Sequence, residues 1–440
     1  MIQKRIYLVM LVAAMLLLCG CMSTVDQMYC LPKRSEEFQN LQSAMDGAMV
    51  DLQYFAPLSG EHQQTVQAAD LDGNGIDEYL VFAKGYSDKP LKILIFSSVD
   101  DEYTLSATIE SNGSAFDQVE YAQIDGQPGM ELVVGTKVSD QVLRSVGAYR
   151  FDGWQVTRLV TANYAKYLTC DLDRDGLSEV MVLRPGLSDT DNGVAELYGM
   201  EQGVIERYNE AVMSEPVDNL KRIITGKLNG GVPAVFVGST VEDGGIITDI
   251  YAIVDGMFTN VSLSNESGTS VQTLRNYYVY ATDIDDDGIV ELPDLITMRS
   301  VSGTRAIDRQ YLIRWFAMNT DGTEVDKMYT FHNYVGGWYM QLDKDLAERI
   351  TVVQEAHGFD FFLWEDQKSE PEKLFSVYAF TGQDRELMAV SGNRFALYKD
   401  ESTVFAAYLD VTSASYGITP EDLIDSFCLI RQEWKTGVTE

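Results

Sequence analysis

A nine-residue acidic motif that returns along the chain constrains the fold more than any other feature of this sequence. The motif is D-x-D-x-[DN]-G-x-x-E, and intact copies cover residues 70–78, 171–179 and 283–291. Degenerate copies begin at Gln123 and Lys227, so successive starts are separated by 53, 48, 56 and 56 residues. Regular spacing of this size indicates a repeat architecture.

Short apolar runs flank the motif and are typical of strands. In the first repeat these runs are residues 66–69, 79–83, 91–96 and 103–109. Four short antiparallel strands that recur about every fifty residues are typical of propeller blades, which bury their faces against one another. The sequence therefore predicts a mainly β fold, with a β-propeller of about five four-stranded blades over 59–335 and a small C-terminal α+β domain over 336–440. Residues 50–55 are a candidate closing strand.

The motif also has the donor pattern of a metal loop. Acidic side chains at positions one, three and nine, Asp or Asn at position five, and the backbone carbonyl of position seven offer about five oxygens to a hard cation that takes roughly six to eight. The predicted ligand sets are Asp70, Asp72, Asn74, Ile76 (carbonyl) and Glu78; Asp171, Asp173, Asp175, Leu177 (carbonyl) and Glu179; and Asp283, Asp285, Asp287, Ile289 (carbonyl) and Glu291.

Two other structures have loops of similar composition. An EF-hand places a glutamate at position twelve between two helices, whereas position twelve here is Val81, Val182 or Asp294 and the flanks predict strands. The loops can also be acidic turns, where Asp, Asn and Gly are favoured by turn geometry alone. That interpretation is favoured for the copies at Gln123 and Lys227, which lack a carboxylate at position one.

With these motifs, residues 60–335 resemble the FG-GAP or VCBS-type repeat family of integrin-α-like propellers and bacterial surface proteins. The resemblance implies Ca²⁺ at two to three sites, in the intact loops between two strands of a blade, where it stiffens the blade and takes no part in chemistry. Metal occupancy of the two degenerate loops is left open.

The N-terminus predicts export. Residues 1–20 combine Lys4 and Arg5 with an apolar run too short to span a bilayer comfortably, as in a signal peptide. Leu18-Cys19-Gly20-Cys21 resembles a bacterial lipobox, which implies cleavage before Cys21 and acylation of that cysteine. An ordinary secretory signal ending near Gly20 is the alternative. Residues 21–58 would then hold the anchor, a linker and a short helix, and the lipid would be the chain's contact with the outer face of the membrane.

Composition excludes several function classes. A formal net charge of −34 repels nucleic acid, so we expect no nucleic-acid partner. The three histidines, His62, His332 and His357, have no ligand spacing, which removes most support for zinc sites and histidine-based triads. Apart from Cys19 and Cys21, the remaining cysteines, Cys30, Cys170 and Cys428, cannot form a complete disulfide set.

The C-terminal region contains a second recognisable helix signal. Thr419 is a candidate N-cap followed by Pro420, and Leu423, Phe427, Ile430 and Trp434 form an apolar stripe. We expect this stripe to be core, and a ligand groove lined by Trp364 and Trp434 is the less favoured alternative.

Three functions fit the sequence. The first is a lipid-anchored surface module whose propeller recognises an extracellular protein, peptide or glycan. The second is an extracellular polysaccharide-degrading enzyme on the same scaffold, although the sequence gives no catalytic residues and the paired carboxylates belong to the predicted metal loops. The third is a structural or sensory lipoprotein that docks through its C-terminal domain.

Overall fold

The computed structural model describes residues 36–431, apart from residues 101, 139–143, 187, 189–190, 202, 243, 278, 302–309 and 366–367. The predicted signal peptide, Cys21 and Trp434 therefore lie outside the described residues. Within the described part of the chain the strands form six antiparallel sheets. No helix of that part is both long and apolar enough to cross a membrane.

Each of the first four sheets is built around four consecutive strands. The first contains β2 (Val66–Ala69), β3 (Glu78–Lys84), β4 (Leu91–Val99) and β5 (Glu102–Ser111), with β1 (Gln53–Tyr54) also paired to β3. The second contains β6 (Ala115–Ala122), β7 (Glu131–Lys137), β8 (Arg144–Phe151) and β9 (Val156–Tyr164). The third contains β10 (Lys166–Cys170), β11 (Glu179–Arg184), β12 (Val194–Glu201) and β13 (Val204–Val212), and the fourth contains β14 (Leu220–Lys227), β15 (Pro233–Thr240), β16 (Ile246–Val254) and β17 (Met257–Asn260).

The last two sheets have five strands each. The fifth has the order β18 (Leu292–Thr297), β19 (Tyr311–Met318), β20 (Glu324–Asn333), β21 (Trp338–Leu342) and β27 (Phe427–Leu429). The sixth has the order β22 (Ile350–Glu355), β23 (Gly358–Leu363), β24 (Glu372–Thr381), β26 (Thr403–Leu409) and β25 (Phe395–Lys399). The helices are α3 (Glu36–Ala48), α4 (Lys344–Ala347), α5 (Arg385–Val390) and α6 (Pro420–Ser426), with short 3₁₀ turns η1 (Val217–Asn219), η2 (Val271–Thr273) and η4 (Val411–Tyr416).

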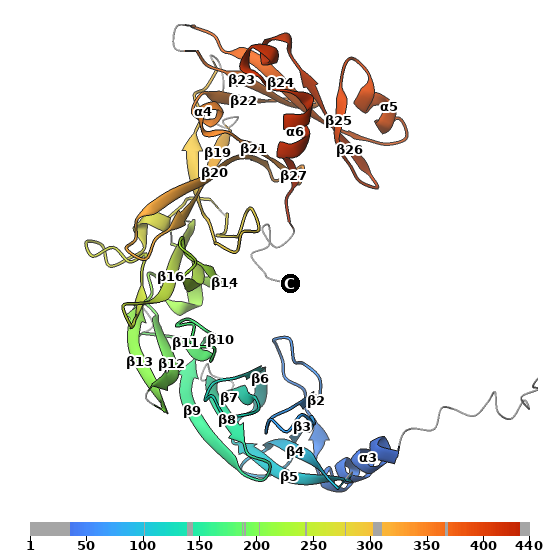
Figure 1. Ribbon diagram of the computed structural model, residues 1–440, viewed down its shortest axis with the longest axis vertical. Helices are drawn as coiled ribbons and strands as arrows, with labels where there is room; N and C mark the ends of the chain where they lie inside the picture. The colour runs from blue at the N-terminus through green and yellow to red at the C-terminus, as the bar shows by residue number, and fades with distance from the viewer. Residues whose placement is uncertain are drawn as a thin grey trace, which may run out of the picture.

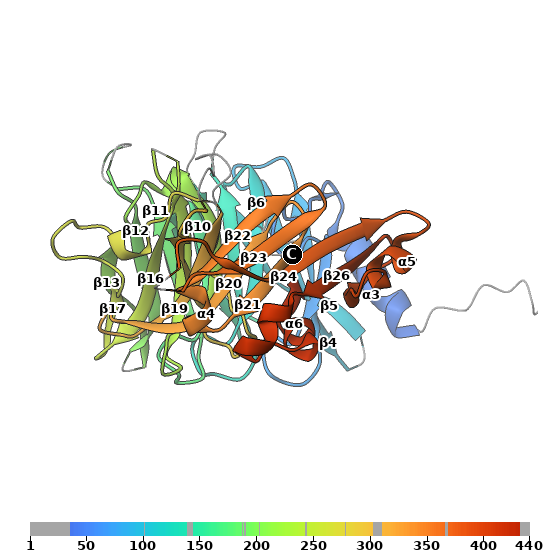
Figure 2. The ribbon, with the colours of Figure 1, turned by 90° about the horizontal axis from the view of Figure 1, so that it is seen from above.

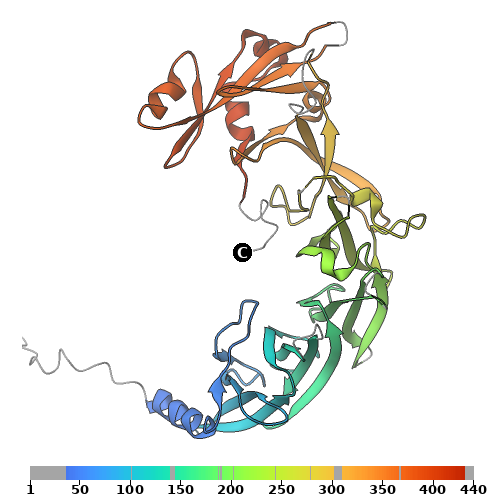
Figure 3. The same ribbon diagram turned by 180° about the vertical axis from the view of Figure 1, so that it is seen from behind.

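The sheets follow one another along an open arc (Figures 1 and 3). In each of the first four sheets the first strand lies toward the inside of the arc and the fourth toward the outside (Figure 1). Seen from above, the strands run between the two rims of the arc (Figure 2). The predicted mainly β class with repeated four-stranded antiparallel sheets is confirmed, but the two ends of the arc do not meet, so the structure is not a closed ring.

The sheets are held together face to face. Leu80 and Phe82 of β3 pack toward the second sheet against Phe116 and Val134, and neighbouring sheets along the arc share similar apolar clusters. Because strand residues alternate between faces, a strand with both faces covered must be apolar along its whole length. This explains the continuous apolar runs that follow the acidic loops.

A helix covers the outer face of the sheet at each end of the arc. At the first end, Leu41 and Met45 of α3 pack on Val81, Leu94 and Phe96, the face of the first sheet that points away from the second. At the other end, Ala389 of α5 packs on Phe380, Val404 and Ala406 of the sixth sheet. These helices occupy the faces on which further sheets would have to stack, which accounts for the open arc.

The C-terminal segment returns to the fifth sheet. The boundary that the loss of the repeat predicts after residue 335 falls inside that sheet, because β20 and β21 are hydrogen-bonded across it and β27 pairs with β21. The helix predicted from Thr419 has its capping box but ends at Ser426. Phe427 lies in a strand because its backbone pairs with Met340, so the helical interpretation beyond Ser426 is wrong.

Two smaller expectations also differ from the structure. The strand expected before loop 283–291 is reduced to a single bridge between Thr282 and Glu291. The candidate closing strand of residues 50–55 contributes β1, which pairs with β3 of the first sheet and not with the last one.

Candidate metal centres

The three intact acidic loops lie at the same kind of position in their sheets. Loop 70–78 connects β2 to β3, loop 171–179 connects β10 to β11, and loop 283–291 leads into β18. In each loop the carboxylates of positions one, three and nine come together, with their ligand atoms within 4.8 Å of one another. The three acidic groups, each able to hold a metal ion, are Asp70, Asp72 and Glu78; Asp171, Asp173 and Glu179; and Asp283, Asp285 and Glu291.

The glutamate at position nine closes every loop in the same way. Its Oε2 accepts a hydrogen bond from the backbone N–H of position two, at 2.9 Å for Glu78, 2.7 Å for Glu179 and 3.1 Å for Glu291. These side chains are almost fully buried, with exposed fractions of 1%, 1% and 0%. In loop 283–291 the other oxygen of this glutamate, Glu291 Oε1, is buried and has no hydrogen-bond partner among the described residues. A buried carboxylate oxygen without a partner is costly, and a cation in the loop would supply the missing partner.

Burial perturbs these carboxyl groups in one direction. It raises the pKa of Glu78 to about 7, that of Glu179 to about 8 and that of Glu291 to about 7, and the neighbouring aspartates add to the shift. Hydrogen bonds from the loop backbone oppose the shift without cancelling it. A positive ion among the carboxylates would favour their charged form, so the electrostatics of the loops fit a cation.

The aspartate at position one organises the loop backbone. Its two oxygens accept from the N–H of position four and of position six in the first loop, at 2.8 Å from Gly73 and 3.0 Å from Gly75. Gly75 has φ +84°, which a residue with a side chain rarely adopts, and this explains the glycine at position six.

The side chains at position five form turns of their own. Asn74, Asp175 and Asp287 accept a bond at 2.7 Å from the N–H of position seven, which is Ile76, Leu177 or Ile289. Asp175 and Asp287 do not join the carboxylate groups of their loops. The oxygen of Asp287 that is not used in the turn lies 3.3 Å from Lys327 Nζ, so this loop already contains one cationic side chain.

The loops are linked to one another. The N–H of position eight donates to the carbonyl of position one in the preceding loop at three of the four junctions: Met130 to Asp70 at 3.1 Å, Ser178 to Gln123 at 2.6 Å and Val290 to Lys227 at 2.9 Å. At the remaining junction the Arg174 guanidinium donates to the carbonyl of Gly231. The five loops therefore form one hydrogen-bonded row, and an ion that stiffens one loop also stiffens the junction with its neighbour.

Protein groups occupy the degenerate loop 123–131, although Gln123 Oε1 is buried there without a hydrogen-bond partner among the described residues. Arg150 Nη1 lies 2.9 Å from Asp125 Oδ2, and the amide of Gln123 donates to the carbonyls of Gln127 and Gly129 at 2.6 and 2.8 Å. The arginine supplies the positive charge that an ion would bring to an intact loop. In the degenerate loop that begins at Lys227, the Asn229 amide Nδ2 donates to Asn319 Oδ1 at 2.8 Å, and position nine of the motif is not a glutamate.

The role of Arg150 can be measured directly. We expect Arg150→Ala to lower the free energy of unfolding by about 2 kcal/mol, because the nearly buried carboxylate of Asp125 loses its ionic partner. Arg150→Lys, which keeps a positive charge, should lose less than half as much. The measurement is urea unfolding of both variants in excess EDTA, and equal losses in the two would contradict this role.

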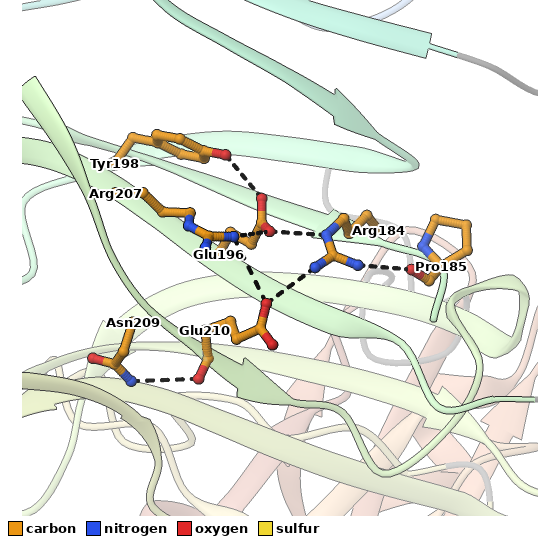
Figure 4. Close-up of polar contacts among 7 residues, drawn as sticks. All are labelled: Arg184, Pro185, Glu196, Tyr198, Arg207, Asn209 and Glu210. Atoms are coloured by element: carbon orange, nitrogen blue, oxygen red, sulfur yellow. Dashed lines mark hydrogen bonds and ion pairs between the residues drawn. The ribbon is translucent and has the colours of Figure 1, made fainter. Parts of the chain in front are cut away.

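A second charged cluster lies in the third sheet, outside the loops (Figure 4). Glu196 is bonded at 2.9 Å by Arg184, at 2.7 Å by Arg207 and at 2.9 Å by the hydroxyl of Tyr198, and Arg184 also contacts Glu210 at 3.1 Å. Burial works against ionisation of Glu196, but these hydrogen bonds prevail and lower its pKa. A carboxylate held charged between two arginines joins neighbouring strands and is poorly suited to proton transfer.

Comparisons with known proteins give no assignment. No family model and no curated protein matches the chain. Among solved structures, the exotype rhamnogalacturonan lyase YesX has a TM-score of 0.30 at 14% identity. The match covers 72% of this chain, and this chain spans just under two thirds (66%) of that lyase. Rhamnogalacturonan lyase YesW has a TM-score of 0.30 at 12% identity, with coverage of 73% and 72%, and a Lactobacillus plantarum protein has 0.28 at 10%, with coverage of 72% and 85%. At these TM-scores the similarities assign neither fold nor activity.

Sequence reasoning missed several residues that the structure brings to the loops. Arg150 is 25 positions after Asp125 in the sequence, and the antiparallel pairing of β7 with β8 brings the two side chains close enough to form an ion pair. Trp154 is 65% exposed in the β8–β9 turn, and a Cβ built on its neighbour Gly153 would lie 3.4 Å from Asp72 Oδ2. The signal available in sequence was the missing carboxylate at Gln123, which implies that another group satisfies that loop.

Proposed function

We propose that this chain is a calcium-stabilised β-propeller-type binding module, displayed outside a bacterial cell membrane and tethered there by a lipid on Cys21. The observation that carries the proposal is the threefold recurrence of one acidic group, with the position-nine glutamate buried in each copy. Such groups are built to hold a cation rather than to react. The module would present its loops and turns to an extracellular protein or glycan, as repeat proteins with extended concave surfaces do.

Calcium fits these loops better than other common ions. All donors are oxygens, which disfavours zinc, and the three groups allow a flexible shell completed by water, which Mg²⁺ accepts less readily. The carbonyls of Ile76, Leu177 and Ile289 would add a ligand each. Bound calcium would supply positive charge to the buried glutamates and tighten the row of loops, and no chemical step is assigned to it.

The alternative is an extracellular polysaccharide-degrading enzyme. If it cleaves by hydrolysis, it requires a pair of carboxyl groups outside the calcium loops, one able to donate a proton and one charged. The carboxyl groups whose pKa is raised to about 7 or 8 are those of Glu78, Glu179 and Glu291, which belong to the proposed calcium loops, and that of Glu131, which lies in the degenerate loop 123–131. Incubation of the purified protein with soluble plant and bacterial polysaccharides separates the two functions, because only an enzyme generates new chain ends.

Terbium luminescence tests the calcium part of the proposal at a single loop. Tb³⁺ replaces Ca²⁺ at oxygen sites and emits when a nearby tryptophan is excited. We expect tryptophan-sensitised emission that excess calcium quenches, and we expect Trp154→Phe to remove the share that comes from loop 70–78. Asp72→Ala should remove the same share, and the two changes together should remove no more. Trp364→Phe, directly after β23, is the control and should leave the signal unchanged.

The terbium result has a clear contrary outcome. Emission that calcium does not displace, or that Asp72→Ala leaves intact, would contradict a cation site in loop 70–78.

A further inference from the structure

Three large exposed side chains gather on the first sheet, at the first end of the arc. Val50 is 69% exposed just after α3, Tyr54 is 46% exposed in β1, and Tyr86 is 95% exposed in the turn between β3 and β4. Water does not satisfy apolar side chains as it satisfies exposed polar ones. A patch of such side chains is typical of a surface that meets a partner or a membrane.

The local fold joins these residues into one surface. β1, which contains Tyr54, pairs with the last residues of β3. The Leu52 side chain fills the space beside Gly85, because a Cβ built on this glycine would lie 2.6 Å from Leu52 Cδ2. The segment that contains Val50 and Tyr54 therefore packs directly on the turn that contains Tyr86.

This surface lies on the rim of the arc opposite the acidic loops. Loop 70–78 leads into the start of β3, and Tyr86 follows the end of the same strand. β3 has seven residues. It therefore separates the loop from the turn by about 23 Å, at roughly 3.3 Å per residue. A contact at Tyr86 leaves the acidic loops free on the other rim.

The charge of this surface differs from that of the whole chain. Segments 49–54 and 84–92 contain three lysines and two aspartates, a net charge of +1, whereas the chain has a net charge of −34. The Lys89 side chain is 62% exposed, and Lys92 is paired with Glu110. The surface is thus close to neutral, so anionic lipid head groups do not repel it as they repel the rest of the chain.

From these features we infer that Val50, Tyr54 and Tyr86 contact the lipid surface of the membrane to which the chain is tethered. Tyrosine suits this place because its ring is apolar and its hydroxyl reaches water. Glu36, the first residue of α3, is 15 positions after Cys21. A tether of that length reaches at most about 50 Å and holds the surface near the bilayer at high effective concentration. The inference rests on the lipid tether of the proposed function.

Quenching by brominated lipid tests the contact, because bromine quenches tryptophan emission only at short range. The full-length acylated protein is reconstituted into phosphatidylcholine vesicles with or without bromine on the acyl chains. Tyr86→Trp keeps an aromatic ring at the surface, and most of its added emission should be lost in brominated vesicles. Val204→Trp is the control, at a 58% exposed position beside the β12–β13 turn on the rim of the acidic loops, and its emission should not change.

A second pair of variants tests the surface itself. In the Tyr86→Trp protein, Val50→Asp places a charge that lipid cannot solvate and should abolish the quenching. Val335→Asp, at a fully exposed position in the β20–β21 turn, adds the same charge and should leave the quenching unchanged. Emission from Tyr86→Trp that bromine does not quench overturns the inference, as does quenching that Val50→Asp leaves intact. Emission that changes with the density of protein on the vesicle instead identifies a second copy as the occupant and also overturns it.

The mass of the N-terminal peptide distinguishes the two levels of the account. An acylated Cys21 without quenching at Tyr86→Trp defeats only the contact surface. A chain without the acyl group defeats the lipid tether of the proposed function, and the contact surface with it.

Discussion

The triple variant Asp70→Ala, Asp171→Ala, Asp283→Ala is expected to lose nearly all of the stabilisation that calcium gives to the parent protein. Calcium held at a hundredfold over its dissociation constant adds about 2.7 kcal/mol for each independent site, so three sites add roughly 8 kcal/mol. The three aspartates each bring two oxygens into their loops, and their removal takes away a ligand together with the bonds that shape the loop. Thermal and urea unfolding with calcium and with EDTA measure the difference.

The control variant makes the same change in net charge at positions outside the loops. Asp88, Asp218 and Glu266 are exposed and outside the loops, and replacing all three by alanine raises the net charge by the same amount. This second variant should retain the full calcium response. If both variants retain it, the loops are acidic turns, and their carboxylates become candidates for catalytic groups.

The second large effect is expected at the first end of the arc. Leu41→Ala with Met45→Ala should lower the free energy of unfolding by about 2 to 5 kcal/mol for each residue, because both side chains are buried between α3 and the first sheet. Loss of the helix also uncovers Val81, Leu94 and Phe96, an apolar face that neighbouring molecules would cover. We therefore expect concentration-dependent self-association in addition to lower stability, measured by urea unfolding and sedimentation velocity.

The matched variant for this experiment lies on the same helix. Asn40 and Ser43 are exposed on α3, and replacing both by alanine leaves the contact with the first sheet intact. Normal stability and a monomer are expected. A monomeric and fully stable Leu41→Ala, Met45→Ala protein would contradict the role of α3 as the cover of the arc.

The sequence predicted those parts of the fold that depend on local pattern. The acidic motif located the turns, and the apolar runs beside it became β3, β7, β11 and β15 because both faces of each strand are buried. The convergence of the acidic side chains also followed from the motif, since positions one, three and nine are fixed by a single loop. Calcium binding and lipidation of Cys21 remain predictions.

Long-range packing was beyond local pattern. The open arc depends on α3 and α5 covering the end faces, and no periodicity states which segment covers a sheet that would otherwise accept a neighbour. At Phe427 the apolar spacing fits a helix as well as a strand, and pairing with β21 decides the outcome. Arg150 reaches Asp125 through a contact across a sheet, so this ion pair leaves no contiguous motif.

The most direct test of the account is the number of calcium ions bound by each chain at saturation. Isothermal titration of the metal-free protein, checked by elemental analysis after gel filtration, gives this number without any assumption about stability. Three ions in the parent protein, with one lost for each of Asp70→Ala, Asp171→Ala and Asp283→Ala made singly, is the result that the three loops predict. No bound calcium, or a number that these substitutions leave unchanged, would contradict the account.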